Sequence, residues 1–359
     1  MNVIILIPAL NPDVKFAEYV GSLSREDFRH IVVVNDGSDK EFEPIFEEIS
    51  KKENCTVICH EVNKGKGRSL KFGMKYVMEN YHDCVGIVTA DADGQHRLTD
   101  IIRVANALEE NDNRLILGSR DFTSGDIPAR SSFGNKLTSK VFALMFGQKL
   151  MDTQTGLRGI PLKIIPQILK ISGERFEYEM NMLIECRRKN IEIFEIPIQT
   201  IYIDENSSSH FRPVVDSVKV YLLIFKGFFS FVISSFACTI IDLCIYALLV
   251  KLIIPQSVES RIIIATVIAR VISSVANFIV NKNLVFHKKG GLLSSAIKYY
   301  VLVLVQMLIS ANVVNWIFGL MQFGEVLIKV IVDVTLFFVN YFIQKKLIFR
   351  DNIQKNSAQ

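Results

Sequence analysis

The sequence predicts an α/β domain with a Rossmann-like, mostly parallel sheet, followed by an all-α domain of four transmembrane helices. In the first part of the chain, short runs rich in Val and Ile alternate with polar, helix-patterned segments. This alternation is typical of parallel strands covered by helices on both faces. After about residue 227, apolar residues gather in four long stretches. Half of the 359 residues are hydrophobic, too many for one ordinary soluble domain, so two or three units are expected.

The expected strands and helices follow one another in the order of such a domain. The predicted strands are Val3–Ile7, Ile31–Val34, Thr56–Cys59, Gly86–Thr89, Leu115–Leu117 and Ile191–Ile203. The predicted helices are Lys40–Lys52, Arg68–Asn80, Leu98–Glu110, one that begins near Ala129, and Tyr178–Lys189. Polar clusters follow four of the strands, at residue 11 and at residues 35–38, 91–96 and 118–120. Because ligands bind at the carboxyl ends of strands in such sheets, these clusters predict one site.

The most distinctive cluster is the turn that follows the strand at residues 86–89. The apolar run ends in two carboxylates, Asp91 and Asp93, and an amide, Gln95, comes soon after. Their hard oxygen donors suit Mg²⁺ or Mn²⁺, and a metal held by few carboxylates keeps coordination positions open for substrate phosphates. A plain acidic turn after a strand has the same pattern, so the residues alone leave both interpretations open.

Two further loops are candidates for the same site. The glycine-rich basic loop at residues 63–68 opens a helix, and such loops attract phosphate, although the spacing of a Walker loop is missing. The stretch at residues 35–39 is either a plain Asp-Gly turn or part of the site. Residues 152–159 read as another polar, glycine-punctuated turn.

The C-terminal part predicts a membrane protein with four spans, at residues 228–254, 262–280, 299–323 and 326–343. Each is near the ~20 residues that a helix needs to cross a bilayer. Lysines collect between spans two and three and after span four. The positive-inside rule therefore predicts that the first domain and both termini face the cytoplasm.

The chain is expected to divide at three places. Residues 1–212 form the α/β domain, residues 213–226 an amphipathic juxtamembrane helix that begins at Pro213, and residues 227–350 the membrane domain. Residues 351–359 are expected to be a disordered tail.

The six cysteines show no metal or disulfide pattern, which indicates a reducing compartment. The short apolar N-terminus lacks the basic region of a signal peptide and reads as a first strand.

The membrane part repeats itself. Residues 277–286 parallel residues 340–349, which indicates two related helix hairpins. Charged residues within spans are costly in hydrocarbon, so Asp242, Arg270 and Asp333 are expected to pair or to face a polar interior. A pair between Asp242 and Arg270 is the specific prediction. A structural pairing and a role in moving a substrate are both open.

Several motifs, taken in order, resemble those of family 2 glycosyltransferases of the GT-A fold. The motifs are Pro-Ala-Leu-Asn at 8–11, Val-Asn-Asp-Gly-Ser at 34–38, Asn-Lys-Gly-Lys-Gly at 63–67, Asp-Ala-Asp-Gly-Gln-His at 91–96, Gly-Ser-Arg at 118–120 and Thr-Gly-Leu-Arg at 155–158. The nearest resemblance is to polyprenyl-phosphate sugar synthases of the dolichol-phosphate mannose synthase type. Residues 227–350 resemble the GtrA-like membrane family through their four spans and the Asn-x-x-x-Asn/Gln-Lys endings of spans two and four.

The resemblance implies roles for individual residues. It implies that the nucleotide sugar is bound by Pro8, Asn11, Asp36, Gly37, Lys66, Asp91, Ala92 and Asp93. It implies that Asp91, Asp93 and Gln95 hold Mg²⁺ or Mn²⁺, and that Arg120, Arg130 and Arg158 receive the acceptor phosphate. Arg212 stands just before the juxtamembrane helix, where it either reaches the same phosphate or belongs to a solvated linker; both interpretations are open. Catalysis would then rest on Asp91, Asp93, Arg120 and Arg130. Two departures affect the nucleotide pocket: Pro12-Asp13 replaces the usual Glu after the first-strand Asn, and Asn35 replaces an Asp.

The activity implied is a metal-dependent, inverting transfer of one sugar to a polyprenyl phosphate at the cytoplasmic face of a bacterial cell membrane. It would serve the synthesis of cell-envelope glycans or glycoconjugates. A UDP-sugar is favoured as donor, and GDP-mannose stays open. The expected partners are the nucleotide sugar, the lipid acceptor and the membrane, with no nucleic acid. A homo-oligomer through the transmembrane domain is also open.

Three other functions are weighed against this one. In the first, the membrane domain is a transporter that flips the lipid-linked sugar. In the second, it is a pure anchor that gathers the lipid. The third, a processive polysaccharide synthase, is disfavoured, because the sole tryptophan, Trp316, lies inside span three rather than in the Gln-x-x-Arg-Trp acceptor motif of those enzymes.

Overall fold

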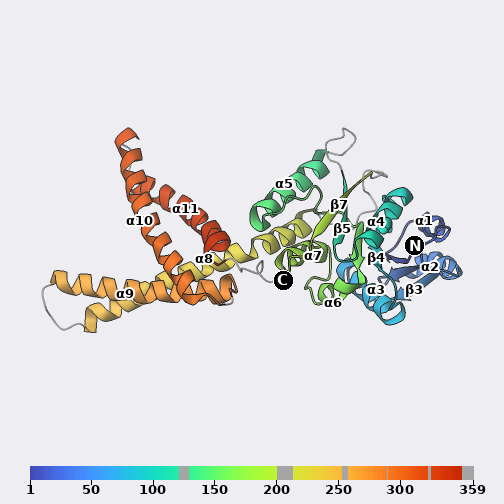
Figure 1. Cartoon of the computed structure of the whole chain (residues 1–359), viewed down its shortest axis with the longest axis horizontal. Coiled ribbons are helices and arrows are strands. Elements are labelled where there is room, and N and C mark those ends of the chain that lie inside the picture. Colours follow the sequence, from blue (N-terminus) through green and yellow to red (C-terminus); the bar gives the residue numbers. More distant parts are fainter. Residues whose placement is uncertain (121–128, 200–212, 253–257, 289, 322–324, 350–359) are drawn as a thin grey trace. The chain divides into compact units, whose positions relative to one another are not determined.

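The computed structural model describes residues 1–120, 129–199, 213–252, 258–288, 290–321 and 325–349 (Figure 1). The chain divides into two compact units, Met1–Ile224 and Phe225–Gln359. This division lies close to the predicted boundary before residue 227. Each unit is described by itself below.

The first unit is built on a seven-stranded sheet with the order β3-β2-β1-β4-β6-β5-β7. The strands are β1 Val3–Ala9, β2 His30–Asn35, β3 Cys55–Cys59, β4 Gly86–Thr89, β5 Leu115–Arg120, β6 Arg158–Pro161 and β7 Ile193–Ile198. β6 runs antiparallel to β4 and β5, and the remaining pairs are parallel. This mixed, mostly parallel sheet confirms the predicted GT-A-like fold.

Seven α-helices accompany the sheet in the described part of residues 1–199. They are α1 Phe16–Ser24, α2 Glu43–Ser50, α3 Lys66–Asn80, α4 Leu98–Glu110, α5 Ala129–Phe146, α6 Ile165–Ile168 and α7 Glu177–Arg188. α4 has the predicted bounds, and α1 and α6 are helices that the sequence pattern did not predict. The prediction of a turn over residues 152–159 was wrong at its end, where Arg158 begins β6. Gly159 and Pro161 are residues typical of turns, and only the neighbouring strands make this segment a strand.

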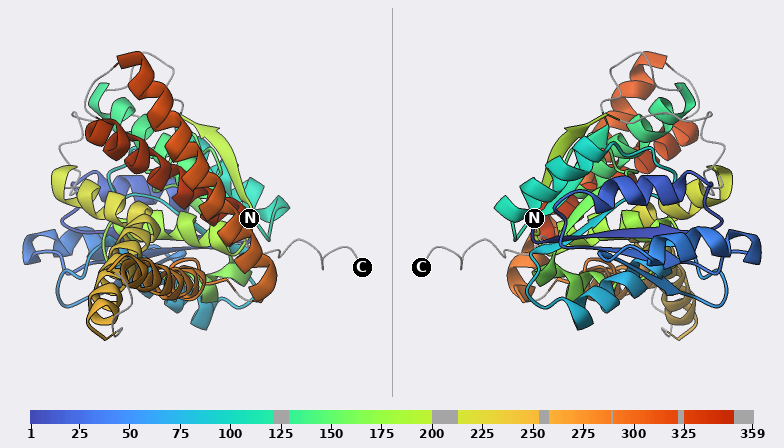
Figure 2. Two further views of the ribbon diagram at one scale, coloured as in Figure 1. Left: turned by 90° about the vertical axis from the view of Figure 1, so that its left-hand side faces the viewer. Right: turned by 90° about the vertical axis from the view of Figure 1, so that its right-hand side faces the viewer.

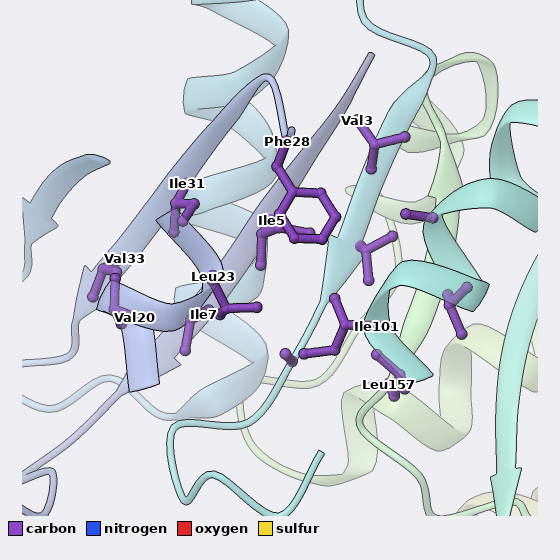
Figure 3. Close-up of a cluster of buried hydrophobic side chains, with 14 of the residues drawn as sticks. Val3, Ile5, Ile7, Val20, Leu23, Phe28, Ile31, Val33, Ile101 and Leu157 are labelled. Atoms are coloured by element: carbon purple, nitrogen blue, oxygen red, sulfur yellow. The ribbon is translucent and has the colours of Figure 1, made fainter. Parts of the chain in front are cut away.

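The side chains of β1 alternate between two apolar layers. Val3, Ile5 and Ile7 point toward one face, where Val20 and Leu23 of α1 lie over them (Figure 3). α2 and α4 contribute to the same cluster of buried side chains. On the other face, α3 packs so closely that a Cβ at Gly73 would lie 3.1 Å from Val34 Cγ2. The views along the long axis show helices above and below the strands of this unit (Figure 2).

The antiparallel strand β6 brings a second turn to the site edge. Arg158, its first residue, pairs with Thr89 at the end of β4 and with Leu117 of β5. Because β6 runs against its neighbours, the turn at residues 152–157 that precedes it lies at their carboxyl ends. The parallel neighbours β2, β1 and β4 bring their own polar clusters to the same edge.

The second unit contains most of four helices that are long and apolar enough to cross a membrane, which confirms the four predicted spans. They are α8 Pro213–Leu252, α9 Val258–Val280, α10 Leu292–Met321 and α11 Glu325–Ile343. α8 has 40 residues and is therefore about 60 Å long, twice the ~30 Å hydrocarbon core. The predicted juxtamembrane segment 213–226 is the first part of this continuous helix.

The predicted repeat is visible in local structure. α9 and α11 each pass into a π-helical turn, at Asn281–Val285 and Gln344–Ile348. Asn281 donates to the side-chain oxygen of Asn277 at 2.6 Å, and Gln344 donates to that of Asn340 at 2.9 Å. The two amides face each other, with Asn281 Nδ2 3.3 Å from Gln344 Oε1. The hairpins therefore meet through equivalent residues.

The charged residues within the spans are paired. Asp242 lies 3.6 Å from Arg270, which confirms the specific prediction. Asp333 accepts hydrogen bonds from Ser310 at 2.6 Å and from Lys329 at 3.0 Å. Pairing lowers the cost of placing these charges in hydrocarbon.

The fold makes a prediction at Gly86. A Cβ there would overlap the carbonyl oxygen of Ile160 and lie 2.9 Å from Pro161 Cα, both backbone atoms of β6. Gly86→Ala is expected to cost about 1–3 kcal/mol of stability and to lower the Tm of the first unit's transition by about 5 °C. Differential scanning calorimetry in detergent measures this. Gly134→Ala is the control, because nothing lies within 4 Å of its Cβ. Equal Tm values for the two variants would contradict the close β4–β6 packing.

Candidate active site

A cleft of about 640 Å³ opens beside the ends of β1, β2 and β4. The predicted nucleotide-sugar residues that line it are Pro8, Asn11, Asp36, Lys66, Asp91, Ala92 and Asp93. Gly37 is not among the lining residues. It has a φ of 71° and passes so close to the backbone of Val62 that a side chain there would clash. The structure therefore brings together most of the predicted donor site.

Asp91 is contacted by side chains from two other parts of the cleft. Its Oδ1 lies 2.7 Å from Lys66 Nζ, and its Oδ2 lies 3.2 Å from His96 Nε2. Burial by itself would favour the neutral carboxyl, but Lys66 and His96 outweigh it and hold the pKa of Asp91 well below its usual range. Asp91 is therefore an anion at neutral pH.

The turn before β6 closes tightly over Asp91. The hydroxyl of Thr89 donates to the carbonyl oxygen of Gly156 at 2.7 Å, which fixes this turn against the end of β4. A Cβ at Gly156 would lie 2.6 Å from Asp91 Oδ1 and would also overlap the second oxygen. Only glycine leaves the carboxylate in its place.

Lys66 is held between two carboxylates from different elements. Besides Asp91, its Nζ lies 3.1 Å from Oε1 of Glu179 in α7, and it sits 5.7 Å from the centroid of the Phe176 ring. Burial would lower the pKa of Lys66, but the two carboxylates reverse this effect and raise it above its usual value. The ammonium group is thus a fixed positive charge in the cleft.

Asp93 and Gln95 complete the acidic turn. Oδ1 of Asp93 accepts the backbone N–H of Gln95 at 3.0 Å. Burial, and then the charge of Asp91, raise the pKa of Asp93. The pKa values of the two carboxyl groups are therefore shifted in opposite directions, downward for Asp91 and upward for Asp93.

The donor set fits a hard divalent cation. Asp91, Asp93 and Gln95 offer only oxygen ligands, the type that Mg²⁺ and Mn²⁺ prefer. Within the described residues, no group of three or more His, Cys, Asp or Glu side chains is arranged to hold a metal. A cation here would therefore take the rest of its ligands from water or from a bound phosphate.

Asp36 holds the glycine-rich loop. Its carboxylate accepts the backbone N–H of Lys64 at 3.1 Å and that of Gly65 at 2.7 Å, and lies 2.8 Å from His60 Nδ1. The side chain is buried, 3 % exposed, yet it lines the cleft. Asp36 thus places Lys66, the next residue along the loop, whatever contact it makes with a nucleotide.

The predicted acceptor arginines do not line this cleft. Arg120, at the end of β5, binds the buried carboxylate of Asp152 through Nε at 2.5 Å and Nη2 at 3.2 Å. Arg158 is 1 % exposed and donates to the carbonyl oxygens of Thr155 and Glu179. The side chain of Arg130 and all of Arg212 lie outside the described residues.

Several residues of the site could not be assigned from the sequence. Glu179 stands near the start of a helix with no local sign that it faces Lys66. Asp152 lies in a turn whose partner, Arg120, is far away in the chain. Tyr19 and Ser69 also line the cleft, and their hydroxyls have no hydrogen-bond partner within the described ranges. Patterns of apolar residues and glycines predict where helices, strands and turns lie in the sequence, but they do not predict which of them come into contact in the fold.

Comparison with known proteins agrees with this arrangement. Residues 4–169 match the family model for glycosyl transferase family 2, and residues 230–349 match the GtrA/DPMS transmembrane domain. The UDP-N-acetylglucosamine–dolichyl-phosphate N-acetylglucosaminyltransferase of Methanococcus voltae is 30% identical over 221 residues, which are 56% of this chain and 86% of that protein. An uncharacterized protein of Methanocaldococcus jannaschii is 30% identical over 224 residues, 61% of this chain and 89% of that one. Glycosyltransferase AglJ of Haloferax volcanii is 21% identical, covering 62% and 71%.

Among solved structures, glucosyl-3-phosphoglycerate synthase from Mycobacterium tuberculosis covers 62% of this chain and 78% of its own, with 12% identity and a TM-score of 0.46. That likeness is too distant to carry a functional conclusion.

The sheet order and the acidic turn after β4 define a GT-A-like glycosyltransferase. The chain belongs to glycosyltransferase family 2, and it carries a GtrA/DPMS membrane domain at its C-terminal end. It is a membrane protein.

The hold of Asp36 on the loop makes a testable prediction. In Asp36→Asn one acceptor oxygen becomes an NH₂ group, so one of the backbone N–H groups of Lys64 and Gly65 loses its partner. Hydrogen exchange at these amides is expected to rise about tenfold, the cost of one unsatisfied donor. Mass spectrometry of the peptide over residues 60–68 measures it. Asp39→Asn is the control, because Asp39 contacts Asn11 rather than this loop. Unchanged exchange in Asp36→Asn would show that the loop holds without it.

Proposed function

We propose that this protein transfers one sugar from a UDP-sugar to a polyprenyl phosphate of the dolichyl type, with inversion and with Mg²⁺ or Mn²⁺. The observation that carries the proposal is the cleft itself, where the acidic turn Asp91–Asp93 and the ammonium of Lys66 face each other. Both features would stabilise a nucleoside diphosphate, the carboxylates by holding a divalent cation and the ammonium as a positive charge of the protein itself. The presence of a membrane domain in the same chain supports a lipid as the acceptor.

The donor is proposed to be a UDP-sugar, with UDP-N-acetylglucosamine as the first candidate. The name of the Methanococcus voltae relative supports this choice, since that protein acts on UDP-N-acetylglucosamine and dolichyl phosphate. The volume of the cleft, about 640 Å³, is in the range of small-molecule sites. GDP-mannose remains the second donor to test.

The residues of the cleft are proposed to have separate roles in catalysis. A bound Mg²⁺ or Mn²⁺ supplies Lewis-acid charge that stabilises the leaving diphosphate. Asp91, Asp93 and Gln95 are the residues that would hold it, and Lys66 adds a hydrogen-bonding cation of its own. A phosphate acceptor is already anionic near neutral pH, so no strong general base is required. One displacement by this nucleophile inverts the anomeric centre.

The acceptor phosphate is assigned to Arg120, with Arg130 beside the start of α5. Asp152 holds the guanidinium of Arg120 through two nitrogens, which orients the planar group that pairs with phosphate. Arg158 is assigned a supporting role, because its guanidinium binds backbone oxygens. Arg212 directly precedes α8 in the sequence and is retained, on that position alone, as a candidate for the same phosphate.

The outer face of α5 supports access to a lipid. Phe133, Leu137 and Leu144 are exposed on it, by 70%, 41% and 53%, and Lys136 and Lys140 stand among them. Apolar side chains mixed with lysines suit the interface of an anionic membrane. α5 also contacts the start of α8, where the hydroxyls of Thr138 and Tyr221 are 3.2 Å apart.

The membrane domain is proposed to anchor the enzyme and gather the lipid, with the catalytic domain and both termini on the cytoplasmic side. The intramembrane charges that left flipping open are paired with each other, so they supply no argument for transport. Trp316 lies in α10, which leaves the processive synthase without its motif. The homo-oligomer and the bacterial cell membrane stay predictions.

The labelled-lipid assay tests the function. Protein in detergent is incubated with Mn²⁺, a polyprenyl phosphate and a panel of labelled nucleotide sugars, beginning with UDP-N-acetylglucosamine. One labelled lipid is expected, and EDTA is expected to abolish it. Asp93→Asn is expected to lower the rate about a hundredfold, since it removes charge that the cation needs. Asp112→Asn, an exposed acid paired with Lys163, is the control. Turnover of a donor without labelled lipid would overturn the acceptor assignment.

Arg120→Lys separates the acceptor from the donor. Lysine keeps the charge but loses the planar fork, so the KM for polyprenyl phosphate is expected to rise about tenfold. The KM for the nucleotide sugar is expected to stay within a factor of about two, because Arg120 does not line the donor cleft. Initial rates at varied concentrations of each substrate measure both constants. A rise confined to the donor KM would place Arg120 in the donor site instead.

A further inference from the structure

One oxygen of the proposed metal site is already engaged by a cation. Lys66 Nζ lies 2.7 Å from Asp91 Oδ1, and it is held from the other side by Glu179 at 3.1 Å. The three groups come from α3, the turn after β4, and α7. Glu179 is only 7 % exposed, and the side chains of Lys66 and Asp91 are half-buried, so this three-membered charge cluster is partly withdrawn from water.

We propose that Lys66 is a displaceable counter-ion: it holds Asp91 in the cation-free enzyme and moves to the donor diphosphate when metal and donor enter together. This inference rests on the proposed function, because it takes Asp91 as a metal ligand. Its consequence is that a divalent cation binds weakly to the enzyme alone and tightly once a nucleoside diphosphate is present.

Charge repulsion is the reason for the coupling. A divalent cation at Asp91 would lie within a few ångströms of the Lys66 ammonium, and in a half-buried site such like charges repel more strongly than in water. Both oxygens of Asp91 are already engaged, Oδ1 by Lys66 and Oδ2 by His96, so a metal bound there would share an oxygen with one of these groups. A diphosphate brings several anionic oxygens, which give Lys66 a new partner and leave Asp91 to the metal.

Glu179 is a positioning residue in this exchange. An ammonium group has three N–H donors, so Lys66 can keep its bond to Glu179 while it replaces Asp91 by a phosphate oxygen. Phe176, which contacts the ammonium from one side at 5.7 Å, lines the same cleft. The movement required is therefore a change of one partner within the cleft, not a rearrangement of the helix.

Linkage makes the proposal measurable without catalysis. If a nucleotide raises the affinity for the cation, the cation must raise the affinity for the nucleotide by the same factor. Removing the Lys66 ammonium should therefore reduce this coupling. It should also change the affinities for the two separate ligands in opposite directions. The cation alone should bind more tightly, whereas UDP should bind less tightly.

The experiment is a titration of the full-length protein in detergent with Mn²⁺ alone, followed by electron paramagnetic resonance of the unbound ion. Lys66→Gln and Lys66→Met are expected to bind Mn²⁺ about tenfold more tightly than the wild type, within the range of typical coupling energies. Lys66→Gln keeps a hydrogen-bonding group between the two carboxylates, so it guards against failure of the methionine variant to fold. Lys66→Arg keeps the charge and is expected to resemble the wild type.

Lys71→Met is the matched control. Lys71 lies in the same helix and forms an ion pair with Glu174 at 3.0 Å, so the substitution removes an equivalent pair without touching Asp91. Its Mn²⁺ affinity is expected to be that of the wild type. A second titration with UDP present should show a smaller gain in Mn²⁺ affinity for Lys66→Gln than for the wild type.

The inference is overturned if Lys66→Gln binds Mn²⁺ alone no more tightly than the wild type, or if UDP leaves the wild-type Mn²⁺ affinity unchanged. Failure of the proposed function is a different result, namely the absence of labelled lipid with wild-type protein. A protein that makes the lipid but shows no tighter Mn²⁺ binding in Lys66→Gln would keep the function and lose only the counter-ion role.

Discussion

The catalytic unit depends on how the half-buried carboxylate of Asp91 is compensated. An anion partly withdrawn from water needs cations or hydrogen-bond donors beside it, and here Lys66 and His96 serve that purpose. Lys66 can reach it because Asp36 fastens the preceding loop, and Glu179 fixes the ammonium from α7. The need to compensate one charge therefore positions three separate segments of the fold.

The same logic extends to Arg120, the cation proposed to receive the acceptor phosphate. Arg120 is held by Asp152, which lies in the turn that antiparallel β6 carries to the sheet edge. Each cation expected to meet a phosphate thus already has a carboxylate partner. Binding of substrates would exchange these partners instead of creating new charge pairs from solvent. Such exchange costs less than desolvating an isolated charge and keeps the side chains in place beforehand.

The membrane unit is organised by a different constraint, the satisfaction of polar groups away from water. The two hairpins end in equivalent π-helical turns, and Asn281 and Gln344 bond to each other between them. Ser234 of α8 adds a bond to Asn281 at 2.7 Å. These amides tie the hairpins together where apolar packing alone would leave their register weakly specified, because apolar contacts are non-directional.

The sequence by itself determined the class of fold, five of the strands close to their bounds and the four spans. It also identified seven residues that line one cleft in the structure. It could do so because strand and helix periods, glycine turns and long apolar runs are local signals. Only the tertiary structure decided that Arg158 begins a strand and is buried, that Asp36 binds backbone amides, and that Glu179 and Asp152 hold the two cations. These partners are far apart in the chain. Topology brings them together, and nothing in a local pattern records which distant residue will share a buried charge.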